Sequence, residues 1–245
     1  MSNEHLILLS AAIFVIAMLY SSVGHAGASG YIAMLALFGI APATLKPTAL
    51  VLNILVAIVV SVQFFRAGHF AWARFWPFAV TSVPLAFVGG AISLPPYLYR
   101  PLVGGILLFS AVRLLFRRPV ADAEVRPPPL YAALLWGAVL GLLSGLTGVG
   151  GGIFLSPLLL FARWADARQA SGTSAVFILV NSVAALLGHL SGVYAVPSFA
   201  VWLAVFAVVG GSIGSYFGSR RLPSVAICRA LAVVLIIAGF KLILV

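Results

Sequence analysis

Two glycine-rich stretches interrupt an otherwise apolar sequence, and their residue types are the ones best suited to bind a ligand. The first reads S-V-G-H-A-G from Ser22 to Gly27, and the second reads L-T-G-V-G-G from Leu146 to Gly151. A helix that begins inside a membrane presents unpaired backbone N–H groups and about half a positive charge, and glycine lets a ligand approach that backbone closely. Two such helix starts predict a binding site for an anion.

Polar side chains near the two stretches add candidate ligands for this anion. His25 and Lys46 offer positive charge, and serine and threonine hydroxyls offer hydrogen-bond donors. Asn53 and Asn181 lie inside apolar segments, where a buried amide needs a partner that is either the substrate or another helix. The predicted substrate-binding residues are Gly24, His25, Gly27, Ser29, Gly30, Lys46, Thr48, Asn53, Thr147, Gly148, Gly150, Gly151, Gly152, Thr173, Ser174 and Asn181.

Ordinary structural roles compete with the binding role for some of these residues. Lys46 could extend along the membrane boundary with its charge in water, and His25 could be a polar packing residue. Isolated glycines such as Gly104 are expected only to let helices pack closely.

Two polar runs are predicted to open helices in corresponding places of the two halves. The run A-S-G-T-S ends at Ser174 and opens the eighth segment, so Thr173 and Ser174 could cap that helix instead of binding an oxyanion. Its counterpart is the run K-P-T, in which Pro47 suits the first turn of a helix.

Acidic residues and cysteines are scarce, which narrows the possible chemistry. The sequence has one cysteine, Cys228, so neither an intramolecular disulfide nor a cysteine metal cluster is available, and it has no nucleotide-binding motif. The acidic residues are predicted at the N-terminus or in loops, so a carboxylate-based cation site or proton relay has no ligands within the spans. We expect no metal and no cofactor. The four acidic residues are Glu4, Asp122, Glu124 and Asp166.

The composition predicts an all-α integral membrane protein. Hydrophobic residues make up 63% of the 245 residues and charged residues 7%, with a mean hydropathy of +1.20. A bilayer core requires about 20 apolar residues per spanning helix, and apolar runs recur along the whole chain. The second and seventh of the ten predicted segments are too short to span upright. The segments are Leu6–Tyr20, Ala28–Ile40, Thr48–Phe65, Phe75–Leu94, Leu102–Phe116, Leu130–Leu143, Ile153–Phe161, Val176–Leu190, Phe199–Phe217 and Ile227–Val245.

Positive charge is distributed unevenly between the two sides of the membrane if all ten segments cross it. One side keeps Lys46, Arg100 and Lys241, and the other collects the remaining eleven basic residues, which marks the cytoplasm and places both termini outside. Hairpins in place of the two short segments would regroup the same residues as seven against seven, so ten crossings are preferred. The eleven are Arg66, Arg74, Arg113, Arg117, Arg118, Arg126, Arg163, Arg168, Arg220, Arg221 and Arg229.

The two halves of the sequence repeat. An offset of 124 residues superposes Gly24 on Gly148 and Gly27 on Gly151. Each half has five segments, an odd number, so the second half enters the membrane upside down relative to the first. Interrupted segments at corresponding places of inverted repeats are the best sequence pointer to a transport site, and both glycine stretches are expected to meet near the membrane midplane.

A polar, proline-rich interval separates the halves. It reads R-R-P-V-A-D-A-E-V-R-P-P-P from Arg117 to Pro129 and is predicted to be a cytoplasmic linker. The predicted organisation is a first repeat over 1–118, the linker over 119–129 and a second repeat over 130–245.

The second glycine stretch and the polar run after it resemble a known family. The sequence S-G-L-T-G-V-G-G-G from Ser144 to Gly152, followed by Pro157 and the A-S-G-T-S run, is similar to the TauE/SafE family of sulfite and organosulfonate exporters, also grouped with toluenesulfonate uptake permeases. The resemblance covers nearly the whole chain and implies a carrier of sulfur oxyanions, sulfonates or related anions in the bacterial inner membrane. In that membrane, the outer side on which the charge distribution places both termini is the periplasm. The first copy reads G-H-A-G-A-S-G from Gly24 to Gly30, so the two glycine stretches need not be equivalent.

Three hypotheses for function follow. The leading one is a secondary transporter of small anions that works by alternating access around a midplane site. The second is a passive anion channel, which saturable counterflow would separate from a carrier. The third is a membrane enzyme, for which His25 and His189 are the candidate bases. The expected partners are a small anionic substrate and membrane lipid but no nucleic acid; the direction of transport, the coupling ion and the oligomeric state are left open.

Overall fold

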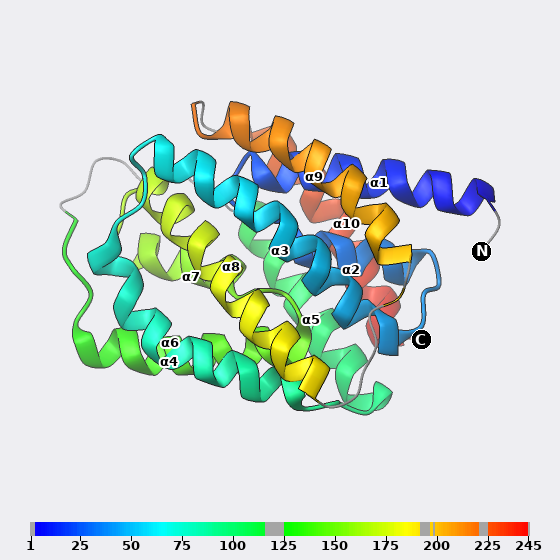
Figure 1. The fold of residues 1–245 in the computed structure, drawn as a ribbon, viewed down its shortest axis with the longest axis horizontal. Helices are drawn as coiled ribbons and strands as arrows, with labels where there is room; N and C mark the ends of the chain where they lie inside the picture. The colour runs from blue at the N-terminus through cyan, green and yellow to red at the C-terminus, as the bar shows by residue number, and fades with distance from the viewer. Residues whose placement is uncertain (1–2, 116–124, 192–196, 198, 221–224, 245) are drawn as a thin grey trace.

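The fold is all helical. The computed structural model describes residues 3–115, 125–191, 197, 199–220 and 225–244, and these residues form ten α-helices and no strand (Figure 1). The helices are α1 (Asn3–Ser21), α2 (Ala28–Leu37), α3 (Pro42–Arg66), α4 (Trp72–Ala91), α5 (Pro96–Leu115), α6 (Leu130–Thr147), α7 (Gly152–Phe161), α8 (Ala167–Ser191), α9 (Phe199–Gly218) and α10 (Val225–Leu244).

The prediction of a multi-pass helical membrane protein is confirmed. Five helices are long and apolar enough to cross a bilayer, and several shorter apolar helices accompany them. The five long spans are Glu4–Ser21, Ala43–Arg66, Leu130–Thr147, Ala167–Ser191 and Phe199–Gly218. As expected, α2 and α7 are short, with ten residues each. Most of the predicted linker lies outside the described residues.

The starts predicted for the third and eighth segments were wrong. Helix α3 begins at Pro42, so Pro47 lies in its second turn. Helix α8 begins at Ala167, and its first turn is capped by Asp166, whose Oδ1 accepts from the backbone N–H groups of the second and third helical residues at 2.9 and 2.8 Å. Ser174 therefore lies inside the helix and caps nothing. The first turns of both helices contain polar residues, Thr44 in α3 and Arg168 and Gln169 in α8, and the search for apolar runs excluded these turns.

The helices run mostly along the long axis of the molecule, and both chain termini lie at one end, here called the terminal end (Figure 1). Segments before α4, α6 and α8 meet at the opposite end. There the Arg74 Nε donates to Trp164 O at 2.6 Å, and the Arg126 backbone N–H donates to Arg163 O at 2.9 Å. We call this the arginine-rich end.

Two ladders of small residues bring helices into close contact. In α6, Gly137, Gly141 and Gly145 recur every fourth residue, and a Cβ at each would collide with a carbonyl oxygen of α4. In α9 the same spacing recurs at 210, 214 and 218 against the carbonyl oxygens of α1 and of Ser22 just after it. Without glycine the backbones would be forced apart, so these spacings fix the α4–α6 and α1–α9 pairs.

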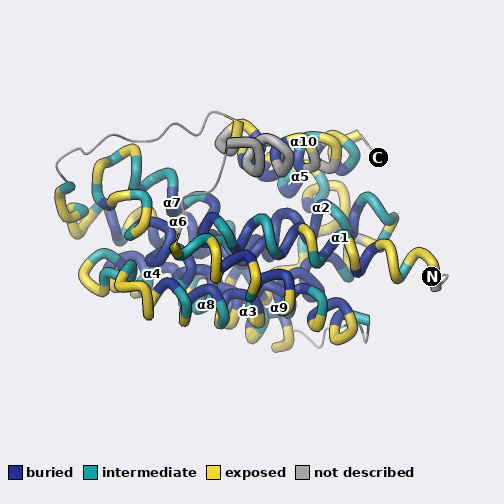
Figure 2. The backbone as a smooth tube through the Cα atoms, turned by 90° about the horizontal axis from the view of Figure 1, so that it is seen from above, coloured by how far each residue is buried: buried dark blue, intermediate teal, exposed yellow. Residues whose placement is uncertain are grey.

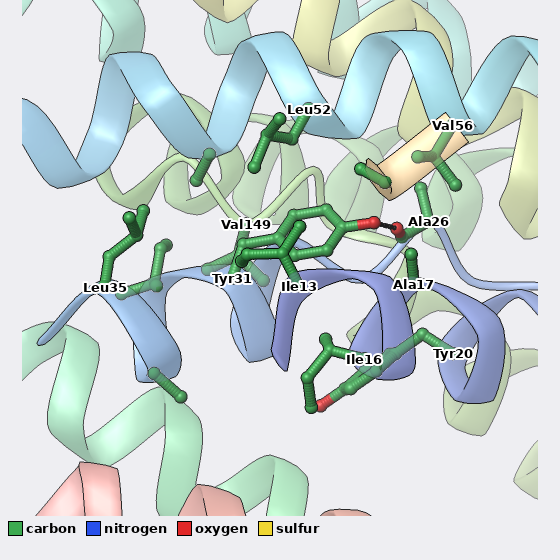
Figure 3. Close-up of a cluster of buried hydrophobic side chains, with 14 of the residues drawn as sticks. Ile13, Ile16, Ala17, Tyr20, Ala26, Tyr31, Leu35, Leu52, Val56 and Val149 are labelled. Carbon is green, nitrogen blue, oxygen red and sulfur yellow. Dashed lines mark hydrogen bonds between the residues drawn. The ribbon is translucent and has the colours of Figure 1, made fainter. Parts of the chain in front are cut away.

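The larger of the two buried apolar clusters in the described residues includes side chains of α1, α2 and α3. Tyr31 is fully buried there among Ile13, Leu52 and Val56, and its hydroxyl donates to Ala26 O at 2.6 Å (Figure 3). Buried residues follow the inward faces of the helices, and exposed ones follow the outward faces (Figure 2). Many of the exposed side chains are large and apolar, which suits contact with lipid rather than water.

Candidate functional site

Both short helices begin at a glycine that an ordinary residue could not easily replace. The N-cap of α2 is Gly27, with φ 104°, and the N-cap of α7 is Gly151, with φ 75°. These left-handed conformations are accessible to glycine at little cost and strain other residues. The two glycine stretches therefore break the chain as their sequence suggested, and each break is followed by a new helix start.

The two helix starts lie beside the middle of the long helices α3 and α8. The Ala28 backbone N–H, at the start of α2, donates to Asn53 Oδ1 at 3.2 Å. Asn53 Nδ2 in turn donates to Ser182 Oγ at 2.7 Å. Asn53 is the twelfth of 25 residues in α3, and Ser182 is the sixteenth of 25 in α8. Gly150 packs against the same amide, so close that a Cβ there would lie 2.5 Å from Asn53 Nδ2.

His25 connects the first glycine stretch to the second short helix. Its Nε2 lies 3.2 Å from Gly152 O and 3.2 Å from Ser156 Oγ, and its Nδ1 lies 3.2 Å from Val23 O. The polar contacts continue into α8, because Ser156 Oγ lies 2.7 Å from Ser174 Oγ. We call the residues that join the two breaks the helix-break site; they are His25, Ala28, Asn53, Gly150, Gly152, Ser156, Ser174 and Ser182.

Three predicted polar residues have a buried oxygen without a hydrogen-bond partner among the described residues. These are the hydroxyls of Thr48 and Thr173 and the Oδ1 of Asn181, whose Nδ2 donates to Phe177 O at 2.8 Å. Thr48 and Thr173 each occupy the seventh position of their helix, α3 and α8. Buried polar atoms are nearly always paired in folded proteins, so these exceptions are candidate contacts for a ligand.

A cavity opens beside His25 toward the arginine-rich end. Its volume is about 60 Å³, enough for several water-sized groups. It reaches from the first glycine stretch past α7 to the first turn of α8. We call it the histidine cavity, and it is lined by Tyr20, Val23, His25, Ser110, Ile153, Ser156, Pro157, Leu160, Ala167, Ala170 and Ser171.

A second cavity, of about 320 Å³, lies at the terminal end. Its basic residues are Arg100 and Lys241, and the Lys241 Nζ donates to Leu37 O at 3.0 Å, at the end of α2. We call it the terminal cavity, and it is lined by Ala36, Gly39, Ile40, Ala41, Leu45, Arg100, Lys241 and Leu242.

The Lys46 charge does not extend into water at the membrane boundary, and its hydrogen bonds go to protein groups. Its side chain is buried, and its Nζ donates to Gly89 O, Gly90 O and Ile92 O at 3.1, 2.9 and 3.1 Å. These carbonyl groups end helix α4, where the helix dipole is negative. Because an ammonium group has three hydrogens, Lys46 is fully used in holding the end of α4.

Five other predicted residues lie away from the helix-break site. Ser29 Oγ donates to Tyr20 OH at 3.1 Å, and Gly30 packs against Tyr20 as well. Thr147 Oγ1 donates to Leu143 O at 2.7 Å within α6. Gly24 packs on Ser171, and Gly148 packs on Lys46.

Two serines of the helix-break site, Ser156 and Ser182, and one that lines the histidine cavity, Ser171, were missed from the sequence. Ser156, Ser171 and Ser182 reach His25, Val23 O and Asn53 across 131, 148 and 129 residues of chain. The one available signal was helical spacing, because Ser156 lies four residues after Gly152 and thus on the same face of α7.

The fold and the site together define a class of protein. The described residues form ten helices with outer faces suited to lipid, and two short helices begin beside Asn53 in the interior; these are features of a multi-pass membrane transporter. The profile of the family described as sulfite exporter TauE/SafE matches residues 9–242, and the chain belongs to this family. The resemblance seen in the glycine stretch is thereby confirmed.

Two curated proteins are similar to the chain. A "probable membrane transporter protein y4hK" of Sinorhizobium fredii is 43% identical over 238 residues, which cover 96% of each chain. A "probable membrane transporter protein MJ0441" of Methanocaldococcus jannaschii is 29% identical over 92 residues, 38% of this chain and 34% of the relative. No solved structure matches significantly. The chain is therefore a membrane transporter.

Proposed function

We propose that the chain is a secondary transporter of small anions, in particular sulfite, sulfonates or related sulfur oxyanions, and that it works by alternating access. The observation that carries the proposal is the meeting of two helix starts beside Asn53 in the protein interior. Each start adds unpaired N–H groups and positive dipole charge, which favour an anion. The choice of sulfur oxyanions as substrates rests on the family's name and on their oxygen atoms, which accept hydrogen bonds from N–H and O–H donors.

The inverted repeat is supported by paired helix lengths. Helices α2 and α7 both have ten residues, α3 and α8 both have 25, and the pairs α4 with α9 and α5 with α10 all have 20. Helix pairs that pack together in one half have counterparts in the other. Helix α1 packs on α9, and the corresponding helices α6 and α4 pack on each other. Helix α4 packs on α8, and the corresponding helices α9 and α3 pack on each other. We infer two repeats, 1–118 and 130–245, joined by the linker over 119–129.

The two cavities support alternating access, because the repeat relates them. Ala36 in α2 corresponds to Leu160 in α7, and Leu45 in α3 corresponds to Ala170 in α8. The first residue of each pair lines the terminal cavity and the second lines the histidine cavity. Two equivalent cavities at opposite ends, with the helix-break site between them, suit a carrier that opens to one side at a time.

The charge distribution supports an orientation in the bacterial inner membrane. The arginine-rich end is proposed to face the cytoplasm, since basic residues collect on that side. Both termini are then periplasmic, the histidine cavity opens inward and the terminal cavity opens outward.

Counterflow in proteoliposomes tests the transport proposal. Vesicles loaded with unlabelled sulfite should accumulate radiolabelled sulfite transiently above its external concentration, and thiosulfate and small sulfonates should compete better than carboxylates. A passive anion channel would give uptake without transient accumulation. Uptake equal to that of protein-free vesicles for every anion of the panel would contradict the proposal.

A further inference from the structure

His25 faces hydrogen-bond acceptors on both sides of its ring. Nδ1 lies 3.2 Å from Val23 O, and Nε2 lies 3.2 Å from Gly152 O. A backbone carbonyl oxygen only accepts hydrogen bonds, so each contact requires a hydrogen on the facing nitrogen. Neutral imidazole has one N–H group, and imidazolium has two. The ring therefore donates to both carbonyl oxygens at once only when it is protonated.

Ser156 gives the neutral ring a different partner. Its Oγ lies 3.2 Å from His25 Nε2 and 2.7 Å from Ser174 Oγ. A hydroxyl group donates and accepts, so Ser156 can donate to Nε2 of the neutral ring while Ser174 donates to Ser156. When the ring is protonated, the same two serines reverse and Ser156 donates to Ser174. The protonation of His25 is thus linked to the hydrogen bonds between α7 and α8.

The ring also has access to water. His25 lines the histidine cavity, and so does one other titratable side chain, Tyr20, which comes from α1. Arg168 lies in the first turn of α8, but its side chain is exposed and does not line this cavity. The polar groups that face the cavity from α5, α7 and α8 are the hydroxyls of Ser110, Ser156 and Ser171. A proton can therefore reach His25 from the arginine-rich end through a cavity that presents three serine hydroxyls.

We propose that His25 is the proton-binding site of the transporter and that a proton and the anion cross together in the same direction; this rests on the proposed anion transport. A protonated ring adds a positive charge next to Gly152, the first residue of α7. Proton and anion then favour each other's binding, and linkage makes this effect reciprocal. One proton accompanies each anion, so a monoanion crosses without net charge. An exchanger would instead require that the proton and the anion exclude each other.

Proton flux measured with anion flux tests this proposal directly. Proteoliposomes with a pH-sensitive dye in the lumen receive an external pulse of methanesulfonate, which carries no proton of its own. A second series uses sulfite, with protein-free vesicles as the blank. The lumen should acidify as the anion enters. Lowering the external pH should raise the initial rate by up to about tenfold per pH unit, the limit for one linked proton.

Two histidine variants localise the effect. In His25→Gln the anion flux should lose its pH dependence and the lumen should no longer acidify. His69→Gln is the matched control, because His69 Nε2 contacts Ser219 O in a loop at the arginine-rich end, and both signals should remain. A thermal unfolding curve verifies that each variant is folded.

Several outcomes would overturn the inference. Anion flux in the unaltered protein with no change of luminal pH, or with alkalinisation, contradicts joint movement whatever the variants do. Acidification that persists in folded His25→Gln contradicts the assignment to His25. If the unaltered protein moves no anion of the panel, the proposed function itself is wrong and this inference falls with it.

Discussion

At the scale of single residues, the interior combines donors that are fully used with hydroxyls that are not. Lys46 donates its three hydrogens to carbonyl groups at the end of α4, whereas the hydroxyls of Thr48 and Thr173 have no partner among the described residues. An unpaired buried hydroxyl costs about 1–3 kcal/mol, so two threonines that only filled space would be better replaced by valine. We interpret them as contacts that the substrate completes.

Thr173→Val tests that interpretation, because valine has nearly the same shape and lacks the hydroxyl. Stability should stay unchanged or rise by up to about 1 kcal/mol, while transport should fall roughly tenfold through loss of one bond to a charged group. Ser174→Ala should also weaken transport, since it removes the partner of Ser156. Initial uptake rates and thermal unfolding measure both effects.

The control for this pair is Thr44→Val, because the Thr44 hydroxyl bonds to Ala41 O at the start of α3, away from the helix-break site. Its transport should match that of the unaltered protein. Unchanged transport in both Thr173→Val and Ser174→Ala would assign these residues to packing alone.

Lys46→Met should separate support of the fold from substrate binding. Methionine fills the space but leaves three carbonyl groups at the end of α4 without their donor, which should cost about 3 kcal/mol of stability. The concentration of anion that gives half-maximal transport should change less than twofold in the protein that remains folded. A normal melting temperature with a large loss of anion affinity would restore Lys46 to the binding site.

At the scale of helices, apolar runs predicted all ten described helices but missed the first turns of α3, α5 and α8. Helix α3 begins P-A-T-L-K and α8 begins A-R-Q-A, so in both the apolar run begins several residues after the helix begins. The glycine breaks were predictable because a positive φ and a helix start both leave local sequence traces. The contacts of His25 with Ser156 and of Asn53 with Ser182 were not, because they depend on how α3, α7 and α8 pack.

Replacing the N-cap glycines should disrupt the helix-break site. At Gly151, φ is 75° and a Cβ would lie 2.9 Å from the Phe177 ring; at Gly27, φ is 104° and a Cβ would lie 2.9 Å from the Tyr31 ring. Gly27→Val and Gly151→Val should therefore abolish anion binding and lower stability, and Gly151→Ala should do so more mildly.

Gly105→Ala is the control, because a Cβ there meets nothing within 4 Å in the middle of α5. It should leave binding unchanged and stabilise the helix by up to about 1 kcal/mol. Binding is measured by thermal stabilisation with sulfite on purified protein. Normal anion binding by both valine variants, in folded protein, would rule out the proposed site.

At the scale of the whole molecule, the proposed inverted repeat makes the second half an upside-down copy of the first. The sequence alone led to this proposal, because Gly148 and Gly151 repeat Gly24 and Gly27 at one offset. The cavities could not be predicted, since they depend on side chains from several helices at each end. The two cavities differ in volume, at about 60 and about 320 Å³, so the proposed repeat does not make them identical.

Reporter fusions test the orientation on which this symmetry depends. If all ten helices cross and the arginine-rich end faces the cytoplasm, alkaline phosphatase fused after Val245 should be active in the periplasm. A fluorescent protein inserted near Ala123, in the proposed linker, should fluoresce in the cytoplasm. The two sites are separated by the five segments of the second half, an odd number that puts them on opposite sides. Finding both reporters on one side would mean an even number of crossings in that half, and two halves so arranged could not be inverted copies of each other.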